Sequence, residues 1–124
     1  MKIKTGVDII EVDRIKEAIE SQGERFLHKV YTQNEIEYCK NKGKMTYQHY
    51  AARFAAKEAI YKAISEIIPQ NENDILNKIE IINTKTGKPI ANLDALHIQN
   101  IESMDLSLSH IKEYAIASFS IVLK

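Results

Sequence analysis

The alternation of apolar and polar residues identifies the β-strands of this chain. Residues 3–11 alternate, so their side chains point in turn to the two faces of a strand. One face carries Ile3, Thr5, Val7 and Ile9, and the other carries Lys4, Gly6 and Asp8. Alternation between turn residues predicts further strands over residues 78–83, 89–92, 103–110 and 114–123. The chain is therefore expected to begin and end in β-structure.

Apolar residues at helical spacing predict three short helices and one long helix between these strands. Their expected ranges are 13–20 with Asp13 as N-cap, 24–30, 32–40 and 47–67. Gly23 separates the first two, and Thr32 and Glu35 have the spacing of a capping box at the start of the third. The long helix is rich in alanine and has to stop before Pro69. Loops are expected at residues 41–44 and 70–74, and a turn at residues 84–88 centred on Gly87.

This order of elements predicts an α+β fold, with an antiparallel sheet packed on one long helix and short helices near the N-terminus. The 124 residues suit a single domain over residues 1–124. A content of 44% hydrophobic and 27% charged residues excludes a disordered, collagen-like or coiled-coil chain. No apolar run approaches the ~20 residues of a membrane span, and the start lacks the pattern of a signal peptide. The single cysteine, Cys39, fits a reducing compartment, so a cytoplasmic protein is expected.

The charge balance argues against a nucleic-acid-binding protein, since 17 basic and 17 acidic residues give no net charge. The charges are nevertheless uneven, because residues 1–62 carry 12 basic against 9 acidic residues. Basic side chains that include Arg14, Arg25 and Lys29 gather in this half. They form either an ordinary solvated surface or a patch for an acidic partner.

Two acids stand out as candidate metal ligands. At 100° per residue, Glu58 and Lys62 fall within a stripe of Phe54 and alanines on the long helix. They could be a surface ion pair, but the small neighbouring residues leave space near the carboxylate. Asp8 lies in mid-strand, where aspartate is disfavoured, beside the small residue Gly6. One acid on a strand and one on a helix packed over it can jointly hold Mg²⁺, which takes one or two carboxylates together with substrate phosphates.

Other segments are compatible with phosphate binding but do not require it. Residues 107–110 combine hydroxyls and an imidazole at the end of a strand, which suits phosphate or ribose contacts or simple strand polarity. The turn at residues 86–89 offers nearby lysines to an anion. Arg53 and Lys57 point well away from Lys62 on the helix and cannot easily serve the same site in one subunit. No P-loop, G-x-G-x-x-G or G-x-S-x-G motif is present, and Cys39 is expected to be a buried small hydrophobe.

Five segments taken together resemble the bacterial holo-[acyl-carrier-protein] synthases, the short single-domain members of the 4′-phosphopantetheinyl transferase superfamily. The segments are GVDIIEVDRI at 6–15, RFLHKVYTQNEIEYC at 25–39, YAARFAAKEAIYKAI at 50–64, TGKP at 86–89 and SLSHIKEYAIASFSI at 107–121. The joint pattern of G-V-D near the start and K-E-A-x-x-K-A on the long helix is specific to the family, and the resemblance covers nearly the whole chain. It implies an enzyme of that fold, which transfers the phosphopantetheine arm of coenzyme A to a serine of acyl carrier protein and releases adenosine 3′,5′-bisphosphate.

The resemblance also implies roles for individual residues. It makes Asp8 and Glu58 the ligands of Mg²⁺ and catalytic residues, with Lys62 as the catalytic lysine that contacts phosphate. The residues that it places against coenzyme A are Lys62, Gly87, Ser109 and His110. It places Arg14, with Arg25 close by, where members meet the acidic carrier protein. Members act in fatty acid biosynthesis as homotrimers with active sites between subunits, which would let Arg53 contact coenzyme A across an interface.

Phosphoryl transfer requires positioning and charge neutralisation more than covalent catalysis. Mg²⁺ between the two acids and the pyrophosphate would neutralise the leaving group, and Lys62 would add a positive charge. Glu58, or a metal-bound water that it orients, is the preferred base, ahead of Asp8. Two competing hypotheses are a non-catalytic module that binds coenzyme A or a nucleotide without Mg²⁺, and a scaffold protein that uses the basic patch.

Overall fold

The computed structural model describes residues 1–124. Its elements, in chain order, are β1 (Lys2–Glu11), α1 (Val12–Gln22), α2 (Glu24–Val30), α3 (Gln33–Cys39), α4 (Thr46–Ile64), α5 (Glu72–Ile75), β2 (Glu80–Asn83), β3 (Pro89–Asn92), β4 (Ile101–His110) and β5 (Tyr114–Leu123). Short 3₁₀ turns cover Gly43–Met45, Leu76–Lys78 and Asp94–Leu96. The expected α+β fold with one long helix is confirmed.

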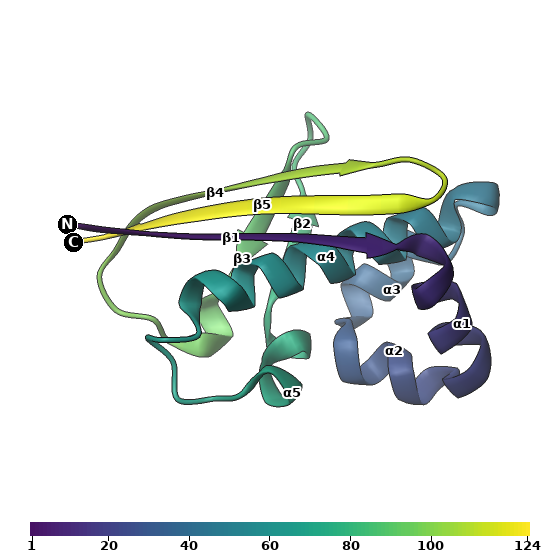
Figure 1. Ribbon diagram of the computed structural model, residues 1–124, viewed down its shortest axis with the longest axis horizontal. Coiled ribbons are helices and arrows are strands. Elements are labelled where there is room, and N and C mark those ends of the chain that lie inside the picture. The colour runs from purple at the N-terminus through teal and green to yellow at the C-terminus, as the bar shows by residue number, and fades with distance from the viewer.

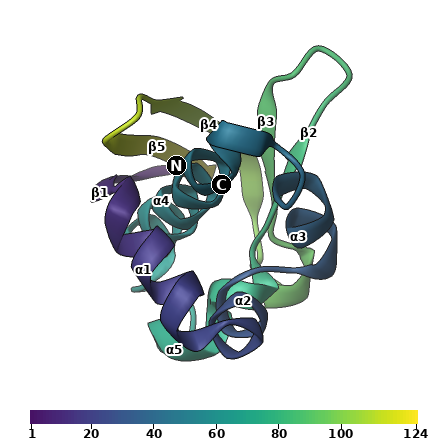
Figure 2. The ribbon, with the colours of Figure 1, turned by 90° about the vertical axis from the view of Figure 1, so that its right-hand side faces the viewer.

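The strands form two antiparallel sheets. The larger has the order β1-β5-β4, so the first and last strands of the chain are neighbours and the two termini lie side by side (Figure 1). The smaller is the hairpin β2–β3, whose turn projects from the molecule (Figure 2). Helix α4 lies between the larger sheet and this hairpin, while α1, α2, α3 and α5 surround its lower side (Figure 2).

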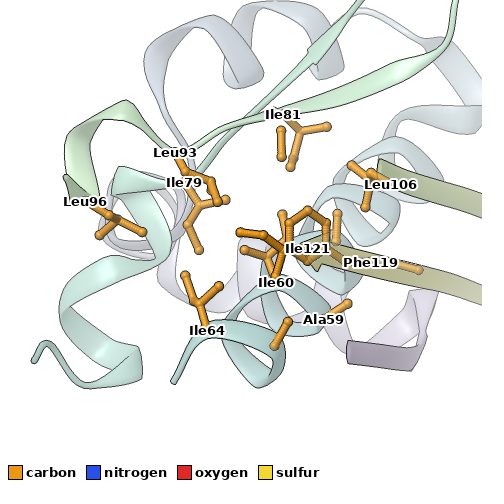
Figure 3. Packing of buried hydrophobic residues seen from close by; sticks show 14 of the residues in the cluster. Ala59, Ile60, Ile64, Ile79, Ile81, Leu93, Leu96, Leu106, Phe119 and Ile121 are labelled. Atoms are coloured by element: carbon orange, nitrogen blue, oxygen red, sulfur yellow. The ribbon is translucent and has the colours of Figure 1, made fainter. Parts of the chain in front are cut away.

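The alanines of α4 explain how one helix packs on both sheets. Small side chains let the helix backbone come close to its neighbours, and α4 is buried on most of its circumference. One core cluster joins its alanines and isoleucines to side chains such as Phe119 and Ile121 of β5 and Ile81 of β2 (Figure 3). A second cluster, around Tyr31 and Tyr50, joins α4 to the three N-terminal helices. Glu58 therefore lies on a helix that is held on both sides by the core.

The alternation predicted for β1 is present, but the apolar face is the exposed one. Ile3, Val7 and Ile9 are 56–66% exposed, whereas the opposite face, which carries Gly6 and Asp8, is packed against α4. The sheet therefore presents apolar side chains on the side turned away from its helix, which a chain that acted alone in water would rarely do.

Several predicted boundaries were wrong. Helix α4 ends at Ile64 and not at Ile67, because the chain already turns at residues 65–67. The segment expected to be a loop at residues 70–74 contains the start of α5. Helix α1 begins at Val12 with Glu11 as its N-cap, so Asp13 lies in the first turn and does not cap the helix. Strand β2 begins at Glu80, two residues later than expected, and β4 begins at Ile101, two residues earlier.

The capping box at the start of α3 is confirmed, and its glutamate does more than cap the helix. Thr32 and Glu35 exchange the expected side-chain to backbone bonds. The Glu35 carboxylate also accepts the backbone N–H of Ile81 at 2.8 Å and pairs with the Lys57 ammonium at 2.7 Å, and both side chains are fully buried. Lys57 donates in addition to the carbonyls of Leu76 and Ile79. This ion pair joins α3, α4 and β2 in the core.

Cys39 is fully buried, as expected for a small hydrophobe, and burial raises the pKa of its thiol to about 12. None of the helices has both the length and the apolar character that crossing a membrane requires.

Candidate active site

Gly6 brings β1 into direct backbone contact with α4. A Cβ at this position would lie 1.8 Å from the carbonyl oxygen of Ala59 and 2.8 Å from its carbonyl carbon, so no larger residue fits. Because the strand approaches so closely, Asp8, two residues further along the same face, lies beside the helix turn that carries Glu58 and Lys62. The sequence prediction that these residues share one site is consistent with this geometry.

Lys62 joins the strand to the helix at this point. Its ammonium lies 3.1 Å from Oδ1 of Asp8 and donates to the carbonyl oxygen of Val7 at 3.0 Å. Asp8 and Glu58 both open onto a cavity of about 330 Å³. The other residues around this cavity are Ile9, Ile10, Glu11, Arg14, Phe54 and Tyr114. Three carboxylates, those of Asp8, Glu11 and Glu58, therefore line one cavity together with Arg14, and Lys62 adjoins it through its pair with Asp8.

The carboxyl of Glu58 lacks a cation of its own. Its pKa is raised to about 8, first by burial, then by a hydrogen bond with Glu72 and the negative charges of Glu72 and Asp8, while Lys62 opposes the shift. Such a pKa marks a site where negative charge is concentrated without full compensation. Sequence reasoning missed Glu72, which lies on α5 in the segment that was expected to be a loop.

These residues fit a magnesium ion. Oxygen ligands are what Mg²⁺ prefers, and it is usually held by one or two carboxylates and by substrate phosphates. A divalent cation between Asp8 and Glu58 would supply positive charge that opposes the effects of burial and of the neighbouring acids on the pKa of Glu58. The chain has no cluster of three or more His, Cys, Asp or Glu side chains that could hold a metal ion.

A second group of predicted residues gathers on another side of α4. The Arg53 guanidinium is almost fully buried, donates to the amide oxygen of Asn83 and stacks on the ring of Tyr38 at 4.1 Å. The side-chain amide of Asn83 donates in turn to the carbonyl oxygen of Gly87 at 3.1 Å. Gly87 itself has φ of 89°, a conformation that favours glycine. These bonds tie the turn of the β2–β3 hairpin to the long helix.

His110 belongs to the same group. Its ring lies 5.4 Å from that of His49, which in turn meets the ring of Tyr38 at 5.6 Å. Contacts therefore run without a break from Gly87 through Asn83, Arg53, Tyr38 and His49 to His110. Lys42 also contacts Tyr38, the ring on which Arg53 stacks, and its ammonium lies 4.1 Å from the ring centre. Basic, aromatic and imidazole groups in one place suit a phosphorylated nucleotide.

Ser109 lies on a surface apart from both groups. It is exposed and pairs with Ile116 across the sheet, on the apolar face that is turned away from α4. Asn83, Tyr38 and His49 were not foreseen, because only the fold brings them next to Arg53 and His110. No local signal in the sequence marks them.

The two groups form separate halves in one chain. Arg53 and Glu58 project from α4 about 140° apart at 3.6 residues per turn. The acidic half contains Asp8, Glu58 and Lys62, and the basic half contains Arg53 and His110 with the Gly87 turn. The prediction that Arg53 and Lys57 point away from Lys62 is consistent with this arrangement, and Lys57 is bound in the core.

The two arginines predicted to meet a partner are exposed. Arg14 lies on α1 at the edge of the cavity that Asp8 and Glu58 share, and pairs with Glu11 at 3.2 Å. Arg25 lies on α2, the next helix. An acidic protein bound along these two helices would reach the carboxylates from this side.

Comparison with known proteins points to one family. The profile of the 4′-phosphopantetheinyl transferase superfamily matches residues 4–118. A holo-[acyl-carrier-protein] synthase of Ruminiclostridium cellulolyticum is 46% identical over 122 residues, covering 94% of this chain and 90% of that protein.

Solved structures agree with this relationship. A holo-(acyl-carrier-protein) synthase from Bacillus anthracis, in complex with CoA (3′,5′-ADP), is 33% identical with a TM-score of 0.80, covering 98% of this chain and 96% of that chain. The holo-[acyl-carrier-protein] synthase of Helicobacter pylori, in complex with coenzyme A, is 29% identical with a TM-score of 0.79, covering 95% of this chain and 99% of that chain.

Proposed function

Because the chain belongs to the holo-[acyl-carrier-protein] synthase family of the 4′-phosphopantetheinyl transferase superfamily, we propose that it transfers 4′-phosphopantetheine from coenzyme A to a serine of apo-acyl carrier protein. The second product is adenosine 3′,5′-bisphosphate, and the reaction requires Mg²⁺. The observation that carries this proposal is the pair of acids, Asp8 and Glu58, facing one cavity beside Lys62. The two relatives in complex with coenzyme A or its 3′,5′-ADP part support the choice of donor.

Asp8 and Glu58 would hold the magnesium ion. When bound, Mg²⁺ neutralises the pyrophosphate of coenzyme A and makes its phosphorus a better electrophile. Lys62 binds a phosphate oxygen, for which its half-exposed ammonium is free to turn away from Asp8. Glu58, kept unprotonated by the nearby cation, or a water molecule that it orients, accepts the proton of the attacking serine hydroxyl.

The basic half of the site would bind the nucleotide part of coenzyme A. His110 offers an N–H donor to phosphate, and the almost fully buried Arg53 adds positive charge and holds the turn at Gly87 through Asn83. Binding here would place a negatively charged ligand where Lys42 and Arg53 bring positive charge together over the ring of Tyr38.

The separation of the two halves supports a homotrimer with active sites between subunits. In one chain the acidic and basic halves point in different directions, and a neighbouring copy would bring them together. The sheet offers a surface for that contact, since Ile3, Val7, Ile9 and Ile116 are exposed on the face turned away from α4. Ser109 lies on this face and would reach coenzyme A at the interface.

Mixing two inactive variants tests the shared site. Glu58→Ala lacks the acidic half and His110→Ala lacks the basic half, so neither forms a complete site alone. If each site joins two subunits, mixed trimers in a one-to-one ratio recover about a quarter of the sites. Co-expressed variants that recover no activity, while each remains folded and trimeric, would show that every site lies within one chain.

The exposed arginines would bind the acidic carrier protein. Arg14→Glu should raise the KM for carrier protein and leave coenzyme A affinity nearly unchanged, since reversal of a rim charge slows association. Equal losses for both substrates would contradict this role. Arg25→Glu should act in the same direction.

The transfer itself is best tested by intact-protein mass spectrometry. Apo-acyl carrier protein is incubated with the enzyme, coenzyme A and Mg²⁺, beside a sample with EDTA and a sample with Glu58→Ala. We expect a phosphopantetheine adduct that requires the metal and is lost in the variant. Coenzyme A binding without an adduct, and without dependence on Mg²⁺, would favour the non-catalytic binding module instead. Such a result would also remove the reason for placing the chain in fatty acid biosynthesis in the cytoplasm.

A further inference from the structure

The side chain of Gln48 makes a direct contact with the ring of His110. Nδ1 of His110 lies 2.8 Å from Oε1 of Gln48, and both side chains are half-buried. Gln48 lies in the first turn of α4, whereas His110 is the last residue of β4. The contact therefore joins the start of the long helix to the end of a strand that is 62 residues away in the sequence.

The geometry gives the two ring nitrogens of His110 different roles. With the carbonyl oxygen of Gln48 facing the ring, the bond forms when Nδ1 carries the proton and donates it to Gln48, because a carbonyl oxygen can only accept. The hydrogen bond made by one ring nitrogen decides whether the other nitrogen carries a proton. Nε2 is thus left without a proton in the neutral ring, and becomes the second N–H donor when the ring is protonated. A ring held in this way accepts a proton at Nε2 without breaking its bond to Gln48.

His49 packs against the ring of His110 without a hydrogen bond. His49 meets the His110 ring edge-on, with the ring centroids 5.4 Å apart and an interplanar angle of 61°. The pKa of His49 is lowered by burial first, and then by the positive charges of His110, Arg53 and Lys42. His49 is thus the packing partner of His110, and Gln48 is the hydrogen-bonding one.

We propose that Gln48 is a positioning residue that fixes His110 with its proton on Nδ1 and turns Nε2 towards the phosphate of the bound coenzyme A. This inference rests on the proposed function for the identity of the ligand, but not for the state of the ring. Gln48 suits the task because its carbonyl accepts Nδ1–H from both the neutral and the charged ring. A phosphate group at Nε2 then favours the charged ring, which donates one N–H to the protein and one to the ligand.

NMR of the ¹⁵N-histidine-labelled full chain tests the ring state without any turnover. Above its titration range, His110 should show a protonated Nδ1 and an unprotonated Nε2, with its signals assigned from His110→Asn. Gln48→Leu should shift this equilibrium towards the Nε2–H form, whereas Gln48→Glu should retain Nδ1–H because a carboxylate still accepts the bond. A wild-type ring protonated on Nε2, or a Leu variant with an unchanged ring, would overturn the proposal.

Kinetics provide the second measurement. We expect Gln48→Leu to raise the KM for coenzyme A about five- to tenfold with little change in kcat, as for loss of one positioning hydrogen bond. Gln48→Glu should restore most of the affinity. The matched control is Gln99→Leu, an exposed glutamine at the other end of the sheet, which should change neither value. An unchanged KM in Gln48→Leu overturns the proposal.

The two measurements separate the proposal from the proposed function. If the enzyme transfers nothing to carrier protein but the wild-type and variant rings behave as expected, the proposed reaction fails and the role of Gln48 in holding His110 stands. If transfer occurs and the ring states do not differ, the positioning role fails alone.

Discussion

Two lysine–carboxylate pairs on helix α4 differ in what surrounds them. Lys57 pairs with Glu35 at 2.7 Å with both side chains at 0% exposure, and its three N–H groups all have acceptors. Lys62 pairs with Asp8 at 3.1 Å, but its side chain is 54% exposed. Lys57 and Glu58 are adjacent in the sequence, yet one is directed into the core and the other into the cavity.

The difference distinguishes structural charges from functional ones. Burial lowers the pKa of Lys57 and the Glu35 carboxylate opposes this, so the pair is a closed network whose members compensate one another. Around Lys62 the compensation is incomplete, because one ammonium faces the carboxylates of Asp8 and Glu58. A network that is closed has no capacity for a ligand, whereas one with uncompensated charge can bind a metal ion or a phosphate.

The largest effect is expected from breaking the closed pair. Lys57→Met leaves the Glu35 carboxylate buried without its cation, which should lower the free energy of unfolding by about 3–5 kcal/mol. Urea titration measures this loss. The double variant Glu35→Gln with Lys57→Met removes the unpaired charge and should recover part of the stability. A loss below about 1 kcal/mol in Lys57→Met would mean that the pair is not a determinant of the core.

The second prediction concerns the close contact between β1 and α4, which positions Asp8 beside Glu58 and Lys62. In Gly6→Ala the new methyl overlaps the backbone of Ala59, so β1 must move away from α4. This overlap should lower the free energy of unfolding by about 1–3 kcal/mol or more. Because Asp8 moves with the strand, transfer activity should fall more than stability alone explains. Gly23→Ala is the control, since no atom lies within 4 Å of its Cβ and only its φ of 59° is unfavourable. Normal activity in Gly6→Ala would show that the close contact does not position Asp8.

The same contrast explains what could be predicted from the sequence. Asp8 and Glu58 stood out for local reasons, since aspartate is disfavoured in mid-strand and Glu58 lies in a stripe of small side chains on an alanine-rich helix. The Thr32–Glu35 capping box was also local and was recognised. Its second role with Lys57 was not, because it depends on how α3 and α4 pack.

Long-range geometry accounts for the remaining gaps. Glu72 affects Glu58 only because the chain after α4 folds back against the helix, and this segment was expected to be a loop. The exposed position of Ile3 and Val7 was likewise not evident from their alternation, since the period of a strand shows that it has two faces but not which of them meets the core.

Substitution of Glu58 is expected to have a smaller effect on the free energy of unfolding, and to raise it instead of lowering it. The folded-state pKa of about 8 lies above the ordinary value of 4.5, so the folded protein holds this proton more tightly than the unfolded chain. The resulting stability is fully present below pH 4.5 and is lost as the pH rises towards 8. Glu58→Gln removes this loss, so the variant should match the wild type at pH 4 and exceed it at pH 8.5. For a half-exposed group the gain should not exceed about 1 kcal/mol.

Thermal unfolding of the metal-free protein across this pH range measures the gain. A stability difference between Glu58→Gln and the wild type that does not change with pH would contradict the raised pKa. Magnesium binding provides a related check, because the ion competes with the proton on Glu58 and should bind more tightly as the pH rises through 8.

The smallest effect on stability is expected where the effect on function is large. Lys62→Met removes a half-exposed lysine from its pair with Asp8, so the free energy of unfolding should change by less than about 0.5 kcal/mol. The rate of transfer should nevertheless fall about 10- to 100-fold, because a charged hydrogen bond to phosphate is lost. Urea titration and the carrier-protein assay on the same preparation test both statements. Lys57→Met is the matched variant, with the same substitution five residues earlier on the same helix. If Lys62→Met were as unstable as Lys57→Met, exposure and hydrogen-bond satisfaction would not distinguish the functional lysine from the structural one.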